Sequence, residues 1–174
     1  MRKRGVYPPF AGGRVGDSGV KCNGSGKKWY MLIGEYRHTL DDKKRLAVPA
    51  SFRKELGRKV VLTRGLDSCL FLYPVKEWQK ISEKLSNLSM GQAESRSFNR
   101  FMFAGASSAE IDGLGRVLIP DFLKSFAGLG AKVVLAGVND RVEIWDEGKW
   151  LEHTGRVEKE ADRLAQKLGE IGVF

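Results

Sequence analysis

The sequence predicts an α+β protein in which two copies of a β-β-α-β-β unit share one small β-barrel, with helices added between the copies and at the C-terminus. The first observation is a repeated phrase. Residues 40–49 and 111–120 both read apolar, Asp, three residues, Arg, apolar, any residue, apolar, Pro, with an offset of 71 positions. The second observation is that further strand-like segments recur at nearly this offset, which locates the duplicated parts. The third is size, because a unit this short buries too little surface to be stable alone.

Both copies show the same order of elements, and local signals place their ends. Pro49 and Pro120 close the second strand and suit the first turn of a helix, while Gly57 and Gly128 can end that helix. The first copy is expected to have strands at 35–40 and 45–48, a helix at 50–56, and strands at 59–63 and 70–73. The second is expected to have strands at 108–111 and 116–119, a helix at 121–127, and strands at 132–136 and 142–145.

Three further helices are expected outside the repeated units. Residues 75–88 and 94–103 have apolar residues at helical spacing and are separated by Gly91. Residues 146–168 read as one long helix with a heptad-like apolar stripe. The stripe consists of Trp150, Val157, Ala161, Leu164 and Leu168. We expect it to pack on the body of the same chain rather than to form a coiled coil.

The N-terminal residues differ in composition from the rest of the chain. Residues 1–30 carry seven Lys or Arg against one Asp and show no periodic apolar pattern, which is typical of disorder. Two interpretations stay open: a flexible basic arm that adds nonspecific nucleic-acid affinity, or an upstream extension without a function. The expected organisation is a disordered basic extension at 1–30, repeats at 35–78 and 107–150, a helical connector at 79–106 and a C-terminal helix at 151–174.

Composition narrows the possible functions. The formal net charge of +9 suits a polyanionic partner, and no apolar run approaches the ~20 residues of a membrane-spanning helix. Cys22 and Cys69 lack a CxxC or His partner, so we expect free thiols in a reducing compartment, without a disulfide or a metal. No P-loop, GxGxxG or paired catalytic set is present, so we expect neither an enzyme nor a cofactor.

The repeated phrase predicts a tight turn between two strands in each copy. An Asp that opens a turn commonly accepts backbone N–H bonds from residues further along it, so Asp41 and Asp112 are expected to shape the turns. Gly113 and Gly115 can supply the positive φ angles that a tight turn needs. These four residues are therefore interpreted as turn-forming.

The arginine of each phrase stands where the turn meets the next strand. Arg45 and Arg116 can pair with the aspartates, or they can present a guanidinium to phosphate groups or guanine edges. Basic residues crowd the first copy: Lys43, Lys44, Arg45, Arg53, Lys54, Arg58 and Lys59. The second copy has fewer: Arg116, Lys124 and Lys132. We therefore expect the first copy to lead in binding a polyanion and the second chiefly to complete the fold.

Three motifs can be compared with known families. They are His38-Thr39-Leu40-Asp41-x-Lys43-x-Arg45-Leu46-x-Val48-Pro49, Asp112-Gly113-x-Gly115-Arg116 and Val142-Glu143-Ile144-Trp145-Asp146. Together they closely resemble the bacterial MraZ family, over residues 31 to about 150. The resemblance implies two SpoVT-AbrB-like swapped-hairpin repeats and assembly into rings. It also implies DNA-binding regulation at the promoter of the division and cell-wall gene cluster, from which the family is itself expressed.

The resemblance also indicates which residues contact DNA. Arg45 is the leading candidate and Arg116 the second; the remaining candidates are Lys43, Lys44, Arg53 and Lys54. The first phrase departs from the family at Lys44, where the family often has Gly. A positive φ at this lysine would cost of order 1 kcal/mol, or the turn takes a different shape.

The leading functional prediction is a sequence-specific transcriptional regulator, expected to be a repressor, that binds double-stranded promoter DNA with repeated short sites. We expect it to self-associate into a ring-like homo-oligomer and to reside in the cytoplasm, at the nucleoid. The alternative is an assembly or partner-binding protein with only nonspecific DNA affinity. The two differ in whether binding prefers one DNA sequence at physiological salt.

Overall fold

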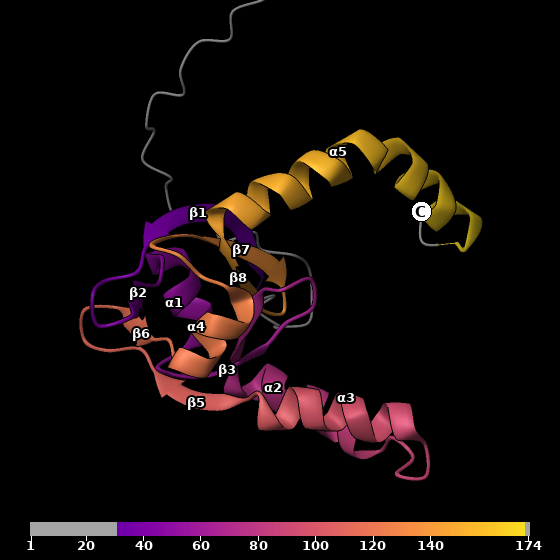
Figure 1. The fold of residues 1–174 in the computed structure, drawn as a ribbon, viewed down its shortest axis with the longest axis horizontal. Coiled ribbons are helices and arrows are strands. Elements are labelled where there is room, and N and C mark those ends of the chain that lie inside the picture. The colour runs from indigo at the N-terminus through magenta and orange to yellow at the C-terminus, as the bar shows by residue number, and fades with distance from the viewer. Residues whose placement is uncertain (1–30, 173–174) are drawn as a thin grey trace, which may run out of the picture.

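The computed structural model describes residues 31–172, which form a mixed α+β fold (Figure 1). The elements in chain order are β1 (Leu32–Thr39), β2 (Arg45–Ala47), α1 (Ala50–Leu56), β3 (Lys59–Arg64), β4 (Leu70–Pro74), α2 (Val75–Ser86), α3 (Ala93–Ala104), β5 (Ser107–Glu110), β6 (Arg116–Leu118), α4 (Asp121–Ala127), β7 (Lys132–Asn139), β8 (Val142–Asp146) and α5 (Glu147–Glu170). The basic extension predicted at 1–30, together with Cys22, lies outside the described residues.

Strands of both copies interlock in two antiparallel sheets. The larger sheet has the order β1-β7-β8-β4-β3-β5, and the smaller is the two-stranded pair β2-β6. The first two strands of each copy pair with the other copy, since β1 pairs with β7, β2 with β6, and β5 with β3. The predicted α+β class is confirmed, and neither unit is complete without the other.

The strands do not close into the continuous barrel that the sequence predicts. Within residues 31–172, the larger sheet ends at β1 on one side and at β5 on the other, and these two strands do not pair. The β2-β6 pair lies beside both of these edge strands, linked to the end of β1 by a bridge between Leu40 and Leu46. In the described part of the chain, no ladder joins β2 to β1 or β6 to β5, so the short pair lies across the gap without closing the sheet.

One hydrophobic core lies between the larger sheet, the β2-β6 pair and helices α1 and α4. Leu46 and Val117, the middle residues of the two short strands, point into this core, as do Phe52 of α1 and Leu123 of α4. A smaller cluster covers the other face of the sheet, under α2 and the start of α5. Its buried residues are Cys69, Phe71, Tyr73, Val134 and Trp145. The short strands are therefore anchored from inside, and their other faces point outward.

Helices α1 and α4 begin and end where the sequence predicts. Pro49 and Pro120 precede them, and each proline carbonyl accepts N–H bonds from the first turn. Gly57 and Gly128 follow the helices with φ angles of 73° and 61°, a conformation that costs glycine little. The two predicted seven-residue helices are thus confirmed.

Helices α2 and α3 form a hairpin that extends away from the body, on the side opposite the β2-β6 pair (Figure 1). Two bonds hold it. The hydroxyl of Thr63 in β3 donates to the carbonyl oxygen of Met102 at 2.9 Å, and the amide Nδ2 of Asn99 donates to the carbonyl oxygen of Leu85 at 3.1 Å. The first bond attaches α3 to the sheet, and the second attaches α3 to α2.

Helix α5 also projects from the body (Figure 1). It contacts the body at its start, where the rings of Trp150 and Trp145 are 5.5 Å apart, but none of its 24 residues is buried. The prediction that its apolar stripe packs on the same chain is therefore confirmed only for Trp150 and is wrong beyond it, because Val157, Leu164 and Leu168 are all exposed. Periodicity shows which face of a helix is apolar but not what covers it. Among residues 31–172, no helix has the length and apolar character needed to cross a bilayer.

Candidate functional site

The first repeated phrase forms a tight turn whose hydrogen bonds converge on Asp41. One carboxylate oxygen, Oδ1, accepts the backbone N–H of Lys43 at 2.9 Å and that of Arg45 at 2.8 Å. The other oxygen, Oδ2, accepts the Nε–H of Arg45 at 2.7 Å and lies 2.7 Å from its Nη2. The same aspartate therefore closes the turn and holds the guanidinium that follows it.

The second phrase repeats this geometry around Asp112. Its Oδ1 accepts the backbone N–H groups of Leu114 and Arg116, both at 2.9 Å. Its Oδ2 accepts the Nε–H of Arg116 at 3.0 Å and the Nη2–H at 2.9 Å. The duplication thus preserves an arrangement in which an aspartate orients an arginine.

Each turn has one residue in the left-handed conformation, at the same position of the phrase. It is Gly115 in the second turn, with a φ of 77°, and Lys44 in the first, with a φ of 59°. Gly113 lies in its turn without a positive φ, so the backbone conformation does not require a glycine there. Of the two alternatives for the first turn, the structure shows the left-handed lysine, which carries a cost of roughly 1–2 kcal/mol.

The turn bonds favour the ionised form of both aspartates. The backbone N–H of Arg45 is the main cause that lowers the pKa of Asp41, and the guanidinium of the same residue adds to it. The backbone N–H of Arg116 lowers the pKa of Asp112 in the same way. Each carboxylate therefore stays negative at neutral pH and holds a positively charged arginine against its turn.

The β2-β6 pair brings the two arginines onto one surface. Its register places Arg45 opposite Leu118 and Ala47 opposite Arg116. Because side chains alternate between the faces of a strand, these four side chains share the outer face, while the middle residues of both strands are buried. The Nη1 of Arg116 also lies 3.8 Å from Oδ2 of Asp41 in the other copy. We call this surface the ribbon face.

Each turn is also fixed to the backbone of the other copy. The N–H of Val48 donates to the carbonyl of Gly115 at 2.8 Å, and the N–H of Ile119 donates to the carbonyl of Lys44 at 2.9 Å. These two bonds add one rung at each end of the β2-β6 pair. The backbone of each turn is therefore hydrogen-bonded to the opposite copy.

The lysines predicted to bind DNA lie in different settings. Lys43 at the tip of the first turn and Lys54 on α1 are exposed. Lys44 instead forms an ion pair with Asp121 at the start of α4, with 2.5 Å between Nζ and Oδ1. The sequence predicts the same role for all three lysines, but the charge of Lys44 is matched by a carboxylate of the other copy.

Arg53 belongs to α1 of the first copy but lies over the second turn. A Cβ atom built on Gly115 would lie 2.1 Å from its Nη1, so the guanidinium occupies the space above that glycine. Sequence reasoning counted Arg53 with the first turn and missed Asp121 altogether. One difference between the copies could have pointed to Asp121, because the first copy has Ala50 at the equivalent position.

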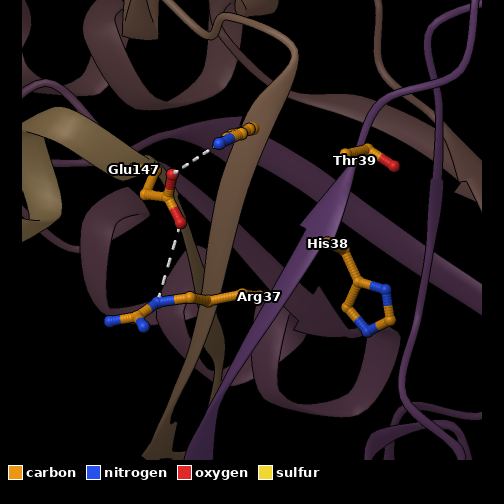
Figure 2. Close-up of a pocket in the computed structure, with 5 residues that line it drawn as sticks. Arg37, His38, Thr39 and Glu147 are labelled. Carbon is orange, nitrogen blue, oxygen red and sulfur yellow. Dashed lines mark ion pairs between the residues drawn. The ribbon is translucent and has the colours of Figure 1, made fainter.

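A shallow hollow of about 370 Å³ lies beside the base of the first turn (Figure 2). It is lined by Arg37, His38, Thr39, Lys132 and Glu147. The carboxylate of Glu147 lies 3.7 Å from Nε of Arg37 and 4.0 Å from Nζ of Lys132. Figure 2 shows His38 pointing away from Arg37 and Glu147. These ion pairs tie the start of α5 to β1 and β7, so we assign the hollow a structural role.

Interlocked copies with paired Asp/Arg turns define a protein of two tandem, related repeats. The family described as "MraZ protein, putative antitoxin-like" matches the chain twice, over residues 31–101 and over residues 102–167. The chain belongs to this MraZ family. Both the resemblance and the internal duplication that the sequence predicts are therefore confirmed.

Curated relatives of the chain are named Transcriptional regulator MraZ. The protein of Caldicellulosiruptor bescii is 48% identical over 143 residues, which cover 82% of this chain and all of the relative. The proteins of Moorella thermoacetica and Syntrophomonas wolfei are 45% and 43% identical with the same coverage. These names place the family among regulators of transcription.

Proposed function

We propose that the protein is a sequence-specific regulator of transcription that contacts double-stranded DNA with its ribbon face. The observation that carries the proposal is that one outward surface presents Arg45 and Arg116 together, each paired with an ionised aspartate. The regulator names of the relatives support the same class of function.

The shape and chemistry of the ribbon face suit the major groove of B-DNA. That groove is about 12 Å wide and admits a two-stranded β-ribbon. Arginine offers a planar fork of donors that matches the O6 and N7 acceptors of guanine. The side chains of Arg45 and Arg116 are 31% and 25% exposed and are already held by their aspartates. Little side-chain entropy is therefore lost when they bind.

Both copies contribute to this surface. The proposal therefore differs from the expectation that the first copy leads in binding and the second chiefly completes the fold. Arg116 is as well oriented as Arg45, and it also lies near Asp41 of the first copy. Exposed cations of the first copy, such as Lys43 at the tip of the turn and Lys54 on α1, would contact phosphates, which position a protein on DNA without specifying the sequence.

We also propose self-association into a ring-like homo-oligomer through the projecting helices. Exposed apolar side chains gather on these helices and on the α2–α3 connection: Leu88 and Met90 in the connection, Phe98 on α3, and Leu164 and Leu168 on α5. Exposed apolar patches commonly mark interaction sites. The helices lie on the side opposite the β2-β6 pair (Figure 1), so contacts between protomers through these helices would leave the ribbon face free. Several linked ribbon faces would then raise the avidity for repeated short DNA sites.

The biological setting in this proposal comes from the family resemblance. The expected target is the promoter of the division and cell-wall gene cluster, including the promoter of the protein's own gene, with repression as the expected effect. The expected location is the cytoplasm, at the nucleoid. The pairing of β1 and β2 with strands of the second copy supports a swapped-hairpin description of the repeats.

The test compares binding to a duplex from upstream of the protein's own gene with binding to a scrambled duplex of equal composition, at physiological salt. The parent protein is expected to prefer the first duplex. Arg45→Ala and Arg116→Ala are each expected to lose about 1–3 kcal/mol of this discrimination, because each removes one base-reading fork. Lys84→Ala is the matched control, since it removes an exposed charge from α2 on the far side of the body.

Two outcomes would contradict the proposal in different ways. Equal binding of both duplexes by the parent protein would favour an assembly or partner-binding protein with only nonspecific affinity for DNA. A loss of preference in Arg45→Ala but not in Arg116→Ala would restore the expectation that the first copy leads in binding DNA and the second chiefly completes the fold.

A further inference from the structure

The first turn is anchored to the opposite copy by the side chain of Lys44 as well as by its backbone. Lys44 stands in the left-handed conformation, and its Nζ lies 2.5 Å from Oδ1 of Asp121. Its carbonyl accepts the N–H of Ile119, two residues before Asp121. The side chains of Lys44 and Asp121 are 42% and 75% exposed, so the pair lies at the surface beside the ribbon face.

The second turn has no equivalent pair. Gly115 occupies the position of Lys44, and Ala50 occupies the position of Asp121. The guanidinium of Arg53 covers Gly115 instead. Among residues 31–172, no carboxylate lies within 4.0 Å of this guanidinium, whereas the charge of Lys44 is matched by Asp121. The two turns therefore differ in the cation that each offers to solvent.

From this difference we infer that Lys44 is a positioning residue that holds the first turn on α4, while Arg53 supplies a phosphate-binding cation beside the second turn. The inference rests on the proposed function, and it assigns one cation of the first copy, Arg53, to the second turn. A lysine whose charge is already matched releases no counterion when DNA binds, whereas an unmatched arginine does. Arg53 thus binds phosphate beside Arg116 of the other copy, and Lys44 helps to keep Arg45 in its orientation.

The salt dependence of DNA binding separates the two roles. The slope of log affinity against log salt falls in magnitude by about 0.9 for each phosphate contact that is lost. Arg53→Gln is expected to lower it by about this amount. Lys44→Gln combined with Asp121→Asn removes the ion pair without changing the net charge, so the slope is expected to equal that of the parent. Lys84→Gln, far from the ribbon face, is the control for loss of one positive charge.

Sequence preference provides the second measurement. The Lys44→Gln/Asp121→Asn variant is expected to lose part of the preference for the upstream duplex over the scrambled duplex, because Arg45 is held less firmly. Lys44→Arg keeps a cation within reach of Asp121 and is expected to retain the preference. A slope reduced by about 0.9 in the double variant would overturn the positioning role. An unchanged slope with an unchanged preference would also overturn it, and an unchanged slope in Arg53→Gln would overturn the role of Arg53.

These results can be distinguished from a failure of the proposed function. If the parent protein binds both duplexes equally, the proposed sequence-specific function fails, and with it the effect of Lys44 on preference. The salt slopes on the scrambled duplex would still show whether Arg53, and not Lys44, contacts phosphate. A double-mutant cycle on Lys44 and Asp121, measured by thermal unfolding without DNA, adds an independent test. It compares the stability lost in each single variant with that lost in the double variant. Additive effects would show that the pair does not anchor the turn.

Discussion

At the scale of single residues, Asp41 and Asp112 link the backbone to the functional side chains. Each uses one oxygen to close its turn and the other to orient an arginine. Turn formation and the placement of a guanidinium therefore depend on the same carboxylate. This dual role explains why the sequence alone could interpret the aspartates as turn-forming and still leave open whether the arginines are structural or bind a ligand.

The lowered pKa values of Asp41 and Asp112 predict how stability depends on pH. An unfolded aspartate titrates near about 3.9, and both folded-state values lie lower. Their ionised form therefore stabilises the fold above about pH 4, and this contribution is lost as the pH falls through the folded-state values. We expect Asp41→Asn/Asp112→Asn to have a lower Tm near neutral pH and a shallower decline on acidification. Circular dichroism melts across this range measure both, and parallel curves would contradict the prediction.

Gly115 and Gly113 offer a matched pair of substitutions. Gly115→Ala places a side chain at a φ of 77° and against the guanidinium of Arg53, so it should destabilise the protein by about 1–2 kcal/mol. Gly113→Ala meets open space without a positive φ and should change stability by less than about 0.5 kcal/mol. Urea unfolding gives both values. Equal costs at the two positions would show that the left-handed conformation of the second turn does not matter.

At the scale of elements, local signals fix α1 and α4 but not the pairing of strands. A proline at the start and a glycine at the end suffice to place these helices, because both act on the backbone of their own neighbourhood. A 71-residue offset shows that two strands are related, yet it does not show which strands they pair with. Two contacts between the copies depend on the pairing of β2 with β6: the ion pair of Lys44 with Asp121, and the guanidinium of Arg53 over Gly115. Residue types alone therefore could not predict them.

Helix α5 provides the prediction at this scale. Leu164→Asp/Leu168→Asp places two charges on its exposed apolar stripe and is expected to reduce the size of the proposed homo-oligomer, since burying unpaired charges at an interface is costly. Gln166→Asp, on another face of the same helix, is the control. Size-exclusion chromatography with light scattering measures the mass, and circular dichroism checks that the protomer still folds. An unchanged mass in the double variant would exclude this face from self-association.

At the scale of the whole molecule, the β2-β6 pair and the projecting helices lie at opposite ends (Figure 1). The sequence predicts the α+β class, the duplication and both short helices, because these depend on local patterns and on internal similarity. It misses the open edges of the sheet and the exposure of α5, because both depend on contacts between distant segments. The ribbon face itself could be predicted only in part: its arginines stand out as a repeated motif, but their joint placement requires the paired strands.

The interlocked pairing also has a consequence for how the chain is made. Leu32 at the start of β1 pairs with Asn139 in β7, so the partner of the first strand is synthesised more than a hundred residues later. At about 5–20 residues per second, a ribosome needs roughly 5–20 s to supply it. During that interval the first repeat leaves the exit tunnel with β1 and β2 lacking their partners. Until translation is nearly complete, the nascent chain therefore exposes unpaired strand edges, which are templates for pairing with other chains.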